Sequence, residues 1–428
     1  MSLKKQSSST TQIFFGLSSF QMLAMFRRGL FYTFLSVYLL EFLNLSPWET
    51  TLYATLPMIM SVIFQNFVWG PISDKLQVRR IFIISGELLA GLGTVIIWAI
   101  HFTFDNLYIA GYVIIFGLSF VEMFWSMSNI SWSALVTDLY PYEKRTKIMG
   151  ELNSIGGLGR IIGIFLGGIL YNQGLGFRNG PLFFVASYVM IISTLAMLLC
   201  PEGGINLKDK EKKEYNELNT KNNQKNVTIF SIFIISLIFI NFGRNSIAVP
   251  YSQYLSLDSG FNVSSVMLSL IANMRSFAVM AIGFIVGFLS KKFGHSRALM
   301  FGTSIVIIAL IITATTVHIT LIFVGGFLIG VAEVIIYASS YSIASNLIPA
   351  RIRAKLFAVY NTTFFLSWGL ASTLISGPLI NILINQGKSK IFAYQLTFLI
   401  AALLCLIGLL IFAFLEIWLK IKNKTKNY

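Results

Sequence analysis

The chain has few charged residues and few cysteines for its length. Of its 428 residues, 11% are charged and 56% are hydrophobic, and the only cysteines are Cys200 and Cys405. So little charge leaves no sizeable water-soluble domain. Two cysteines support neither a disulfide framework nor a metal cluster, and His101, His295 and His318 lie at span ends or in a loop, which makes them poor candidates for a metal site. We therefore expect an integral membrane protein without a metal or cofactor.

Motifs of membrane-embedded enzymes and ATP-driven pumps are also missing. The sequence contains no GxxxxGK[ST], HExxH or DDxxD. The net charge of +15 is spread over many short polar gaps instead of one face with interleaved aromatics. We therefore expect neither an enzyme nor a nucleic-acid partner, and attribute the basic excess to attraction toward anionic lipid.

Long apolar stretches dominate what is present. A helix needs about 20 apolar residues to cross the hydrocarbon core. Twelve stretches meet this length, at residues 13–43, 50–72, 81–102, 107–137, 146–171, 181–200, 228–256, 264–289, 298–318, 320–348, 355–384 and 392–419. The sequence thus predicts an all-α protein with twelve transmembrane helices.

The number of basic residues alternates between low and high from one gap between these stretches to the next. Of the 32, the tails and even-numbered gaps hold 24, and the odd-numbered gaps hold only Arg178, Lys388 and Lys390. Cytoplasmic loops carry the excess of basic residues. We therefore expect both termini in the cytoplasm and the protein in the plasma membrane. The remaining five arginines fall inside predicted helices.

The polar run Lys208–Asn226 divides the spans six and six. It predicts a six-helix bundle over residues 1–201, a cytoplasmic linker over 202–227, and a second bundle over 228–428.

The two halves resemble each other. Arg28 and Tyr38 shift by 216 positions onto Arg244 and Tyr254. Apolar bias explains matched leucines but not matched arginines, so we infer a duplication. Because each half has an even number of spans, six, matching spans of the two halves cross the membrane in the same direction. The repeats are therefore parallel, with a pseudo-two-fold axis along the membrane normal.

The segment GPISDKLQVRR, from Gly70, resembles the signature loop of the major facilitator superfamily. The resemblance implies a charge pair between Asp74 and Arg79 or Arg80. A more divergent copy of this loop, GFLSKKFGHSR, begins at Gly287 in the second half and has lysine in place of the aspartate.

The loop DLYPYEKRTK resembles the family's loop after the fourth helix, with Asp138 and Arg145 near the same inside surface. Together with the signature loops, it implies two pseudo-symmetric six-helix bundles that rock about a central site. Gly70, Asp74, Arg79, Arg80, Asp138 and Arg145 are the expected conformational latch. The first span, RGLFYTFLSVYL from Arg28, resembles that of drug and solute exporters.

In the fifth span, GRIIGIFLGG from Gly159 resembles the family's antiporter motif, but Ile164 replaces its proline. The resemblance favours exchange over symport. Small residues at this spacing also permit close helix packing without any coupling role.

Charges near the middle of predicted spans cost about 3 kcal/mol or more unless they face protein or water. Such residues are Arg27 or Arg28, Glu122, Arg160, Arg244, Arg275 and Glu333. We expect these spans to line a wet cavity. Glu87, nearer the inside, fits this pattern less well.

Glu122 and Glu333 are candidate proton carriers, because a carboxyl removed from water holds its proton more readily. They are alternatively fixed ion-pair partners, and Arg27 or Arg28 alternatively serves to neutralise Glu122. Guanidinium forks suit carboxylate and phosphate. The candidate solute-binding residues are Arg28, Arg244, Arg275, Arg160, Tyr32, Asn245 and Tyr337.

The sequence thus predicts a monomeric secondary transporter of a small organic solute, coupled to protons, with export by antiport favoured. One alternative is an organic-anion or organophosphate exchanger or uptake carrier. Another, from a different class, is a transporter-like membrane sensor without flux.

Overall fold

The computed structural model describes residues 10–76, 78–140, 142–203, 223–283, 285–286, 292–347 and 353–424, and within them it is helical with no strand. Eleven of the described helices are long and apolar enough to cross a membrane, and Pro181–Met197 is a shorter apolar helix. Together they confirm the predicted all-α membrane fold with twelve spans.

The chain forms two compact units. Unit 1 comprises Met1–Ser46, Leu52–Asp209 and Ser264–Asn273, and unit 2 comprises Pro47–Thr51, Lys210–Val263 and Met274–Tyr428. Most of the predicted linker, 202–227, lies outside the described residues.

The helices of the first half follow the predicted spans closely. They are α1 (Thr10–Val37), η1 (Tyr38–Phe42), α2 (Pro47–Phe64), η2 (Gln65–Trp69), α3 (Gly70–Leu76), α4 (Arg80–Thr103), α5 (Leu107–Leu139), α6 (Tyr142–Tyr171), η3 (Asn172–Gly174), α7 (Leu175–Arg178) and α8 (Pro181–Met197). Both η1 and η2 are π-helical turns; η1 extends α1 to Phe42, and η2 joins α2 to α3 within one span.

The second half repeats this series. Its helices are α9 (Asn223–Ser246), α10 (Pro250–Ser256), α11 (Ser265–Gly283), α13 (His295–Thr315), α14 (Ile319–Leu347), α15 (Arg353–Ala371), η6 (Ser372–Ser376), α16 (Gly377–Asn385) and α17 (Lys390–Lys424).

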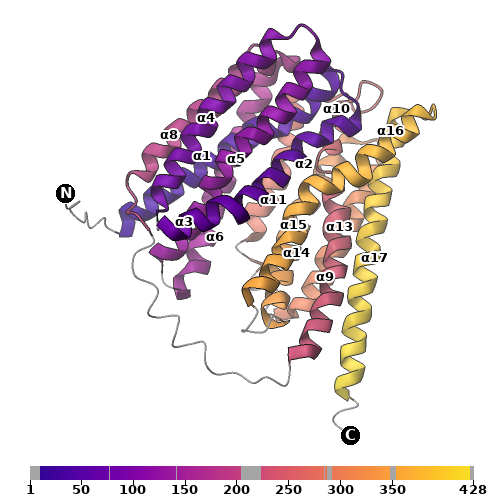
Figure 1. The fold of residues 1–428 in the computed structure, drawn as a ribbon. Coiled ribbons are helices and arrows are strands. Elements are labelled where there is room, and N and C mark those ends of the chain that lie inside the picture. The colour runs from indigo at the N-terminus through magenta and orange to yellow at the C-terminus, as the bar shows by residue number, and fades with distance from the viewer. Residues whose placement is uncertain are drawn as a thin grey trace, which may run out of the picture. The chain divides into compact units, whose positions relative to one another are not determined.

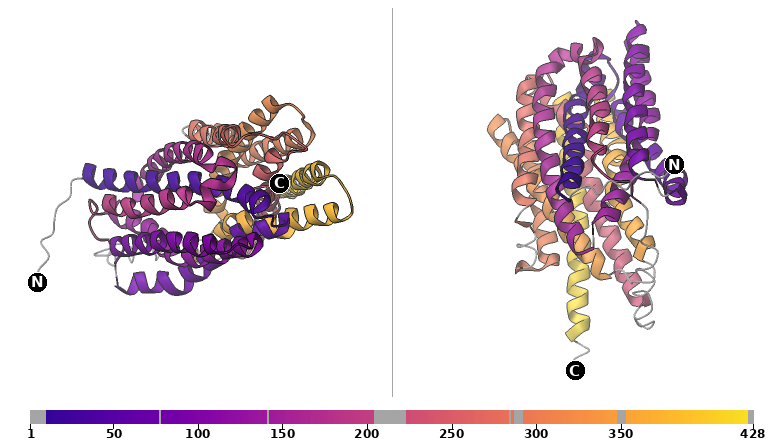
Figure 2. Two further views of the ribbon diagram at one scale, coloured as in Figure 1. Left: turned by 90° about the horizontal axis from the view of Figure 1, so that it is seen from above. Right: turned by 90° about the vertical axis from the view of Figure 1, so that its left-hand side faces the viewer.

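The same helix pairings occur in both halves. In unit 1, α1 contacts α6 and α8, and α4 contacts α5 and α8 (Figures 1 and 2). In unit 2, α9 contacts α15 and α17, and α13 contacts α14 and α17. Counted by span within each half, these are the first with the fifth and sixth, and the third with the fourth and sixth. This shared pattern is what a duplication produces.

A π-helical turn carries the second span past its predicted end at residue 72. The N–H of Gly70 donates to the carbonyl oxygen of Gln65, and the helix continues to Leu76. The extra residue in this turn accommodates Pro71, which lacks an N–H and would clash with a regular helix. A Cβ on Gly70 would lie 2.7 Å from the Gln65 oxygen, so glycine is required here.

The glycines of α6 bring its backbone against that of α1. A Cβ at Gly159 or Gly163 would overlap the carbonyl oxygens of Met22 and Phe26, respectively, and one at Gly167 would lie 2.6 Å from that of Leu30. Without a hydrophobic driving force between helices in lipid, such close van der Waals contact is a main source of association.

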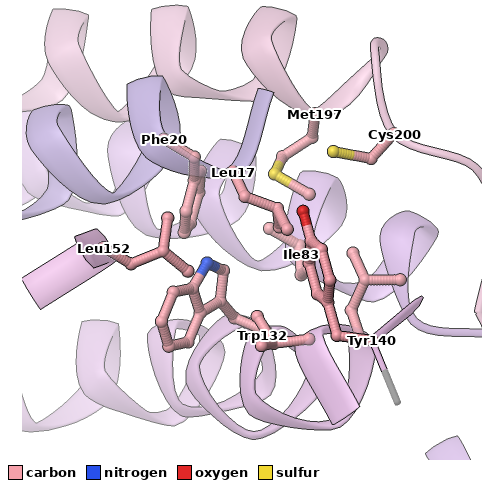
Figure 3. Packing of buried hydrophobic residues seen from close by; sticks show 10 residues of the cluster. Leu17, Phe20, Ile83, Trp132, Tyr140, Leu152, Met197 and Cys200 are labelled. Atoms are coloured by element: carbon pink, nitrogen blue, oxygen red, sulfur yellow. The ribbon is translucent and has the colours of Figure 1, made fainter. Parts of the chain in front are cut away.

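A buried cluster closes one end of unit 1 (Figure 3). Trp132 of α5 and Tyr140, just beyond its end, pack against Phe20 of α1, Met197 of α8 and neighbouring apolar side chains. Cys200, just beyond α8, joins the same cluster and donates its Sγ hydrogen to the Ile13 carbonyl oxygen at 3.7 Å. The cluster therefore joins five helices, α1, α4, α5, α6 and α8, beside the loop that follows α3.

We predict that Gly163→Ala destabilises the folded protein by about 1–3 kcal/mol, because the added methyl forces α6 away from α1. Thermal unfolding of the purified protein measures this as a lowered Tm. Gly283→Ala is the matched control, since nothing lies within 4 Å of a Cβ there. Equal Tm values for the two variants would contradict the role of the glycine contact.

Candidate functional site

Five ionisable side chains of the first half lie on helices of unit 1 that touch one another. They are Arg27 and Arg28 on α1, Glu87 on α4, Glu122 on α5 and Arg160 on α6. The glycine contact between α1 and α6 holds the arginine-bearing parts of these two helices together, because a Cβ on Gly29 would overlap the Arg160 carbonyl oxygen.

Arg27 and Arg28 both contact the indole ring of Trp125. Their Cζ atoms lie 4.0 and 4.4 Å from the ring centroid, which is cation–π geometry. Arg27 is 5% exposed, whereas Arg28 is half-buried. Arg28 forms no hydrogen bond or ion pair within the described residues. Its guanidinium therefore has donors to spare.

Glu87 orients the Trp125 ring that both arginines contact. It is 2% exposed, and its Oε1 accepts hydrogen bonds from Trp125 Nε1 at 2.9 Å and from Ser128 Oγ at 2.8 Å. Sequence reasoning gave Glu87 no role. The sequence did contain one signal for this contact: Trp125 and Ser128 are three residues apart, so they share one face of α5 and can both donate to one acceptor.

Glu122 is 8% exposed; Arg28 and Arg27 attract its carboxylate, Ser61 is its hydrogen-bond partner, and Glu87 repels it. The structure therefore brings together the carboxyl and the arginines that the sequence suggested for coupling. Neither arginine forms an ion pair with Glu122. The carboxyl is thus close to cations without being fixed to one.

Unit 2 contains an ion pair between α11 and α14. Both Nε and Nη2 of Arg275 lie 2.8 Å from Oε2 of Glu333, with about a third of each side chain exposed. Gly330 makes the approach possible, because a Cβ there would overlap the Arg275 carbonyl oxygen. The two midplane charges predicted on these helices are therefore partners of each other.

Arg244 is held by α9 and faces α15. Its Nε donates to Asn241 Oδ1 at 2.9 Å, and Asn241 in turn donates to Thr363 Oγ1 at 3.2 Å. The guanidinium lies 5.6 Å from the Phe364 ring centroid. Within the described residues, Arg244 forms no ion pair, and its two terminal nitrogens bind no acceptor.

The remaining residues predicted to contact the solute differ in how exposed they are and in whether their polar groups are already hydrogen-bonded. Asn245 is 4% exposed and donates to Ser367 Oγ at 2.8 Å, so its amide bridges α9 and α15. Tyr337 is 53% exposed and packs edge-on against Phe364, with ring centroids 5.4 Å apart. Tyr32 is half-buried and stacks with Tyr53.

The loop after α3 carries the charges expected for a latch. Arg79 Nε lies 3.4 Å from Asp138 Oδ2, and its Nη1 donates to Ser73 Oγ. The contact joins the start of α4 to the end of α5. The side chains of Asp74 and Arg145 lie outside the described residues.

Glu202, which sequence reasoning missed, caps α4. Its carboxylate accepts from the backbone N–H of Arg79 and from those of Arg80 and Ile81, at 2.6 and 3.3 Å for the latter two. An anion is favoured at this positive end of the helix. Arg80 also donates to the Cys200 carbonyl oxygen at 2.9 Å. The segment after α8 is thus attached to the start of α4.

No group of histidine, cysteine or acidic residues suited to a metal occurs in the described part of the chain.

Several solved transporter structures have the same fold. A point mutant of the nucleoside transporter NupG matches with a TM-score of 0.74 and 13% identity, over 94% of this chain and 99% of that one. A bacterial homologue of the human lysosomal transporter Spinster, inward-facing and occupied, matches with a TM-score of 0.70 and 14% identity, over 95% and 96%.

A POT family transporter in complex with a thioalcohol-conjugated peptide matches with a TM-score of 0.67 and 14% identity, over 95% of this chain and 96% of that one. Identities this low show the fold alone. A search of curated proteins gives no match.

Comparison with sequence models of protein families assigns residues 17–372 and 233–427 to the Major Facilitator Superfamily. This range covers nearly the whole chain and agrees with the loops that carry the resemblance. The chain therefore belongs to the Major Facilitator Superfamily and is a membrane transporter, not an enzyme.

Proposed function

We propose that this transporter moves a small organic solute bearing a negatively charged group, by alternating access and with proton coupling. One observation carries the proposal: Arg28 and Arg244, at matched positions of the repeat, are both half-buried and keep unused guanidinium donors. Burying a cation in a membrane without an acceptor is costly. A carboxylate or phosphate of the solute supplies that acceptor in bidentate geometry.

The solute contacts that we propose include cations of both units. They are Arg28, Arg160, Arg244 and Arg275, with Tyr32, Asn245 and Tyr337 as neutral contacts. Tyr337 is the most accessible of the neutral residues. Asn245 also holds the neighbouring helix in place, since its amide nitrogen donates to Ser367 Oγ.

Proton coupling is assigned to Glu122 in unit 1 and Glu333 in unit 2. Ionised Glu122 attracts Arg28, and protonation removes this attraction, which leaves the guanidinium free for the solute. In unit 2, Glu333 holds Arg275 directly. Protonation of Glu333 would release Arg275 in the same way. Proton and solute occupancy are therefore linked through the arginines.

The proposed conformational latch consists of Gly70, Asp74, Arg79, Arg80, Asp138 and Arg145. The Arg79–Asp138 contact and the cap of Glu202 on α4 support it. Export is proposed from the resemblance of the first span to that of exporters, and antiport from the resemblance of the fifth span to the antiporter motif. The plasma membrane, cytoplasmic termini and a monomeric state are proposed from the charge pattern and the family.

A second candidate function uses the same arginines. An exchanger of organic anions or organophosphates requires two free guanidinium groups but no titrating carboxyl. It predicts solute exchange without net proton movement. A membrane sensor would bind the solute and show no flux.

We predict that Glu122→Gln keeps the protein folded but abolishes solute flux driven by a pH gradient, because the amide cannot exchange a proton. Proteoliposomes with an imposed pH gradient measure this flux. Asp258→Asn is the control, since Asp258 is an exposed loop residue. Unchanged pH-driven flux in Glu122→Gln would remove its coupling role.

We predict that Arg244→Ala weakens solute binding by about 10- to 100-fold, the effect of losing a hydrogen bond to a charged group. A thermal-shift screen against organic anions, sugars and lipophilic cations first identifies a ligand, and titration then compares variants. Arg297→Ala removes an exposed arginine as a matched control. Equal losses in the two variants would refute the role of Arg244 as an anion contact.

A further inference from the structure

Exposed aromatic side chains of unit 2 lie beside Arg244. On α14, Tyr337 and Tyr341 are 53% and 48% exposed, and on α15 Phe364 is half-buried. The rings of Tyr337 and Phe364 meet edge to face, with centroids 5.4 Å apart. The Cζ atom of Arg244 lies 5.6 Å from the Phe364 ring centroid. A cation of α9 therefore adjoins accessible rings of α14 and α15.

The two tyrosines lie on a different face of α14 from its exposed apolar residues. Leu321 and Val324 are exposed on this membrane-spanning helix, so we infer that they face lipid. At about 100° per residue, Tyr337 lies about 160° around the helix from Leu321 and about 140° from Val324. The side chain of Tyr337 therefore points away from the lipid-facing side.

Glu333 lies on the same face as the tyrosines, because it precedes Tyr337 by one helical turn. About a third of its side chain and of its partner Arg275 is exposed. An ion pair with this exposure would be costly against hydrocarbon. The face formed by Glu333, Tyr337 and Tyr341 therefore opens to water.

The charges beside this face favour an anion. The charged side chains that act on Arg244 are Glu333 and Arg275, which pair with each other at 2.8 Å. Because that pair sums to zero, Arg244 supplies the surplus positive charge. Its Nε donates to Asn241, and its two terminal nitrogens bind no acceptor within the described residues. This open fork suits the two oxygens of a carboxylate or phosphate.

The rings favour an aromatic group on that anion. A ligand whose charged group binds Arg244 places its adjoining atoms beside Phe364 and Tyr337. An aromatic ring at this point gains stacked or edge-to-face contacts in addition to burial, whereas an aliphatic group gains burial alone.

We propose that the solute is an aromatic organic anion, whose charged group binds Arg244 and whose ring packs against Tyr337 and Phe364. The inference rests on the proposed function, in which Arg244 binds an anionic solute. It adds the chemical class of the remainder of that solute and assigns its recognition to α14 and α15.

The test compares benzoate with cyclohexanecarboxylate by calorimetric titration of the purified full chain. The two probes have the same charge and similar size, but only benzoate has a π-system. Aromatic contacts should make benzoate bind about 2- to 10-fold more tightly. Phenyl phosphate and cyclohexyl phosphate repeat the comparison with phosphate as the charged group. Benzyl alcohol, which lacks the charge, should bind about 10-fold more weakly than benzoate.

Tyr337→Leu should remove the preference for benzoate and keep the affinity for cyclohexanecarboxylate, because leucine preserves apolar contact. Phe364→Leu is a second variant and should act in the same way. Tyr337→Phe retains the ring and should retain the preference. Tyr188→Leu is the matched control, since Tyr188 is a 64% exposed tyrosine on α8 of unit 1.

Arg244→Ala separates this inference from the proposed function. It should weaken benzoate and cyclohexanecarboxylate by the same factor, because both bind through their carboxylate. If it does so but the wild type binds the two probes equally, the aromatic assignment is wrong and the proposed function stands. The same holds if Tyr337→Leu and Phe364→Leu both keep the preference. If Arg244→Ala changes neither affinity, or if the wild type binds none of the four anions, both the proposed function and this inference are wrong.

Discussion

Charged side chains inside a bilayer have no bulk water to solvate them, so each needs a partner or a wet cavity within the protein. This chain meets the requirement in two ways. Glu333 binds Arg275, and Glu87 accepts two hydrogen bonds. In contrast, Arg28 and Arg244 keep unused donors at half-buried positions. The satisfied groups stabilise the bundles, and the unsatisfied ones are available to bind a ligand.

Close helix contacts set the positions of these charges. The glycines of α6 place its backbone against α1 near Arg28, and Gly330 places α14 against Arg275. A change of one methyl group in either contact would therefore displace a charged side chain as well as a helix. This packing accounts for the glycines of α6 without requiring a role in coupling.

The fold was largely predictable from the sequence, because span length, basic loops and matched arginines are local or periodic signals. The partners of the buried charged side chains were harder to predict. The pairing of Arg275 with Glu333 depends on how α11 and α14 approach, and the cap that Glu202 forms on α4 joins segments far apart in sequence. Glu87 was overlooked because its partners are neutral side chains. The continuation of the helix beyond Gly70 depends on a π-helical turn that no simple periodicity predicts.

The central claim is that solute and proton occupancy are linked through buried arginines and carboxyls. It is tested most directly by adding an identified solute to proteoliposomes that contain the wild-type protein and a pH-sensitive dye. Our account predicts that a solute gradient drives proton movement across the membrane. Solute binding or exchange with no change in internal pH would contradict it.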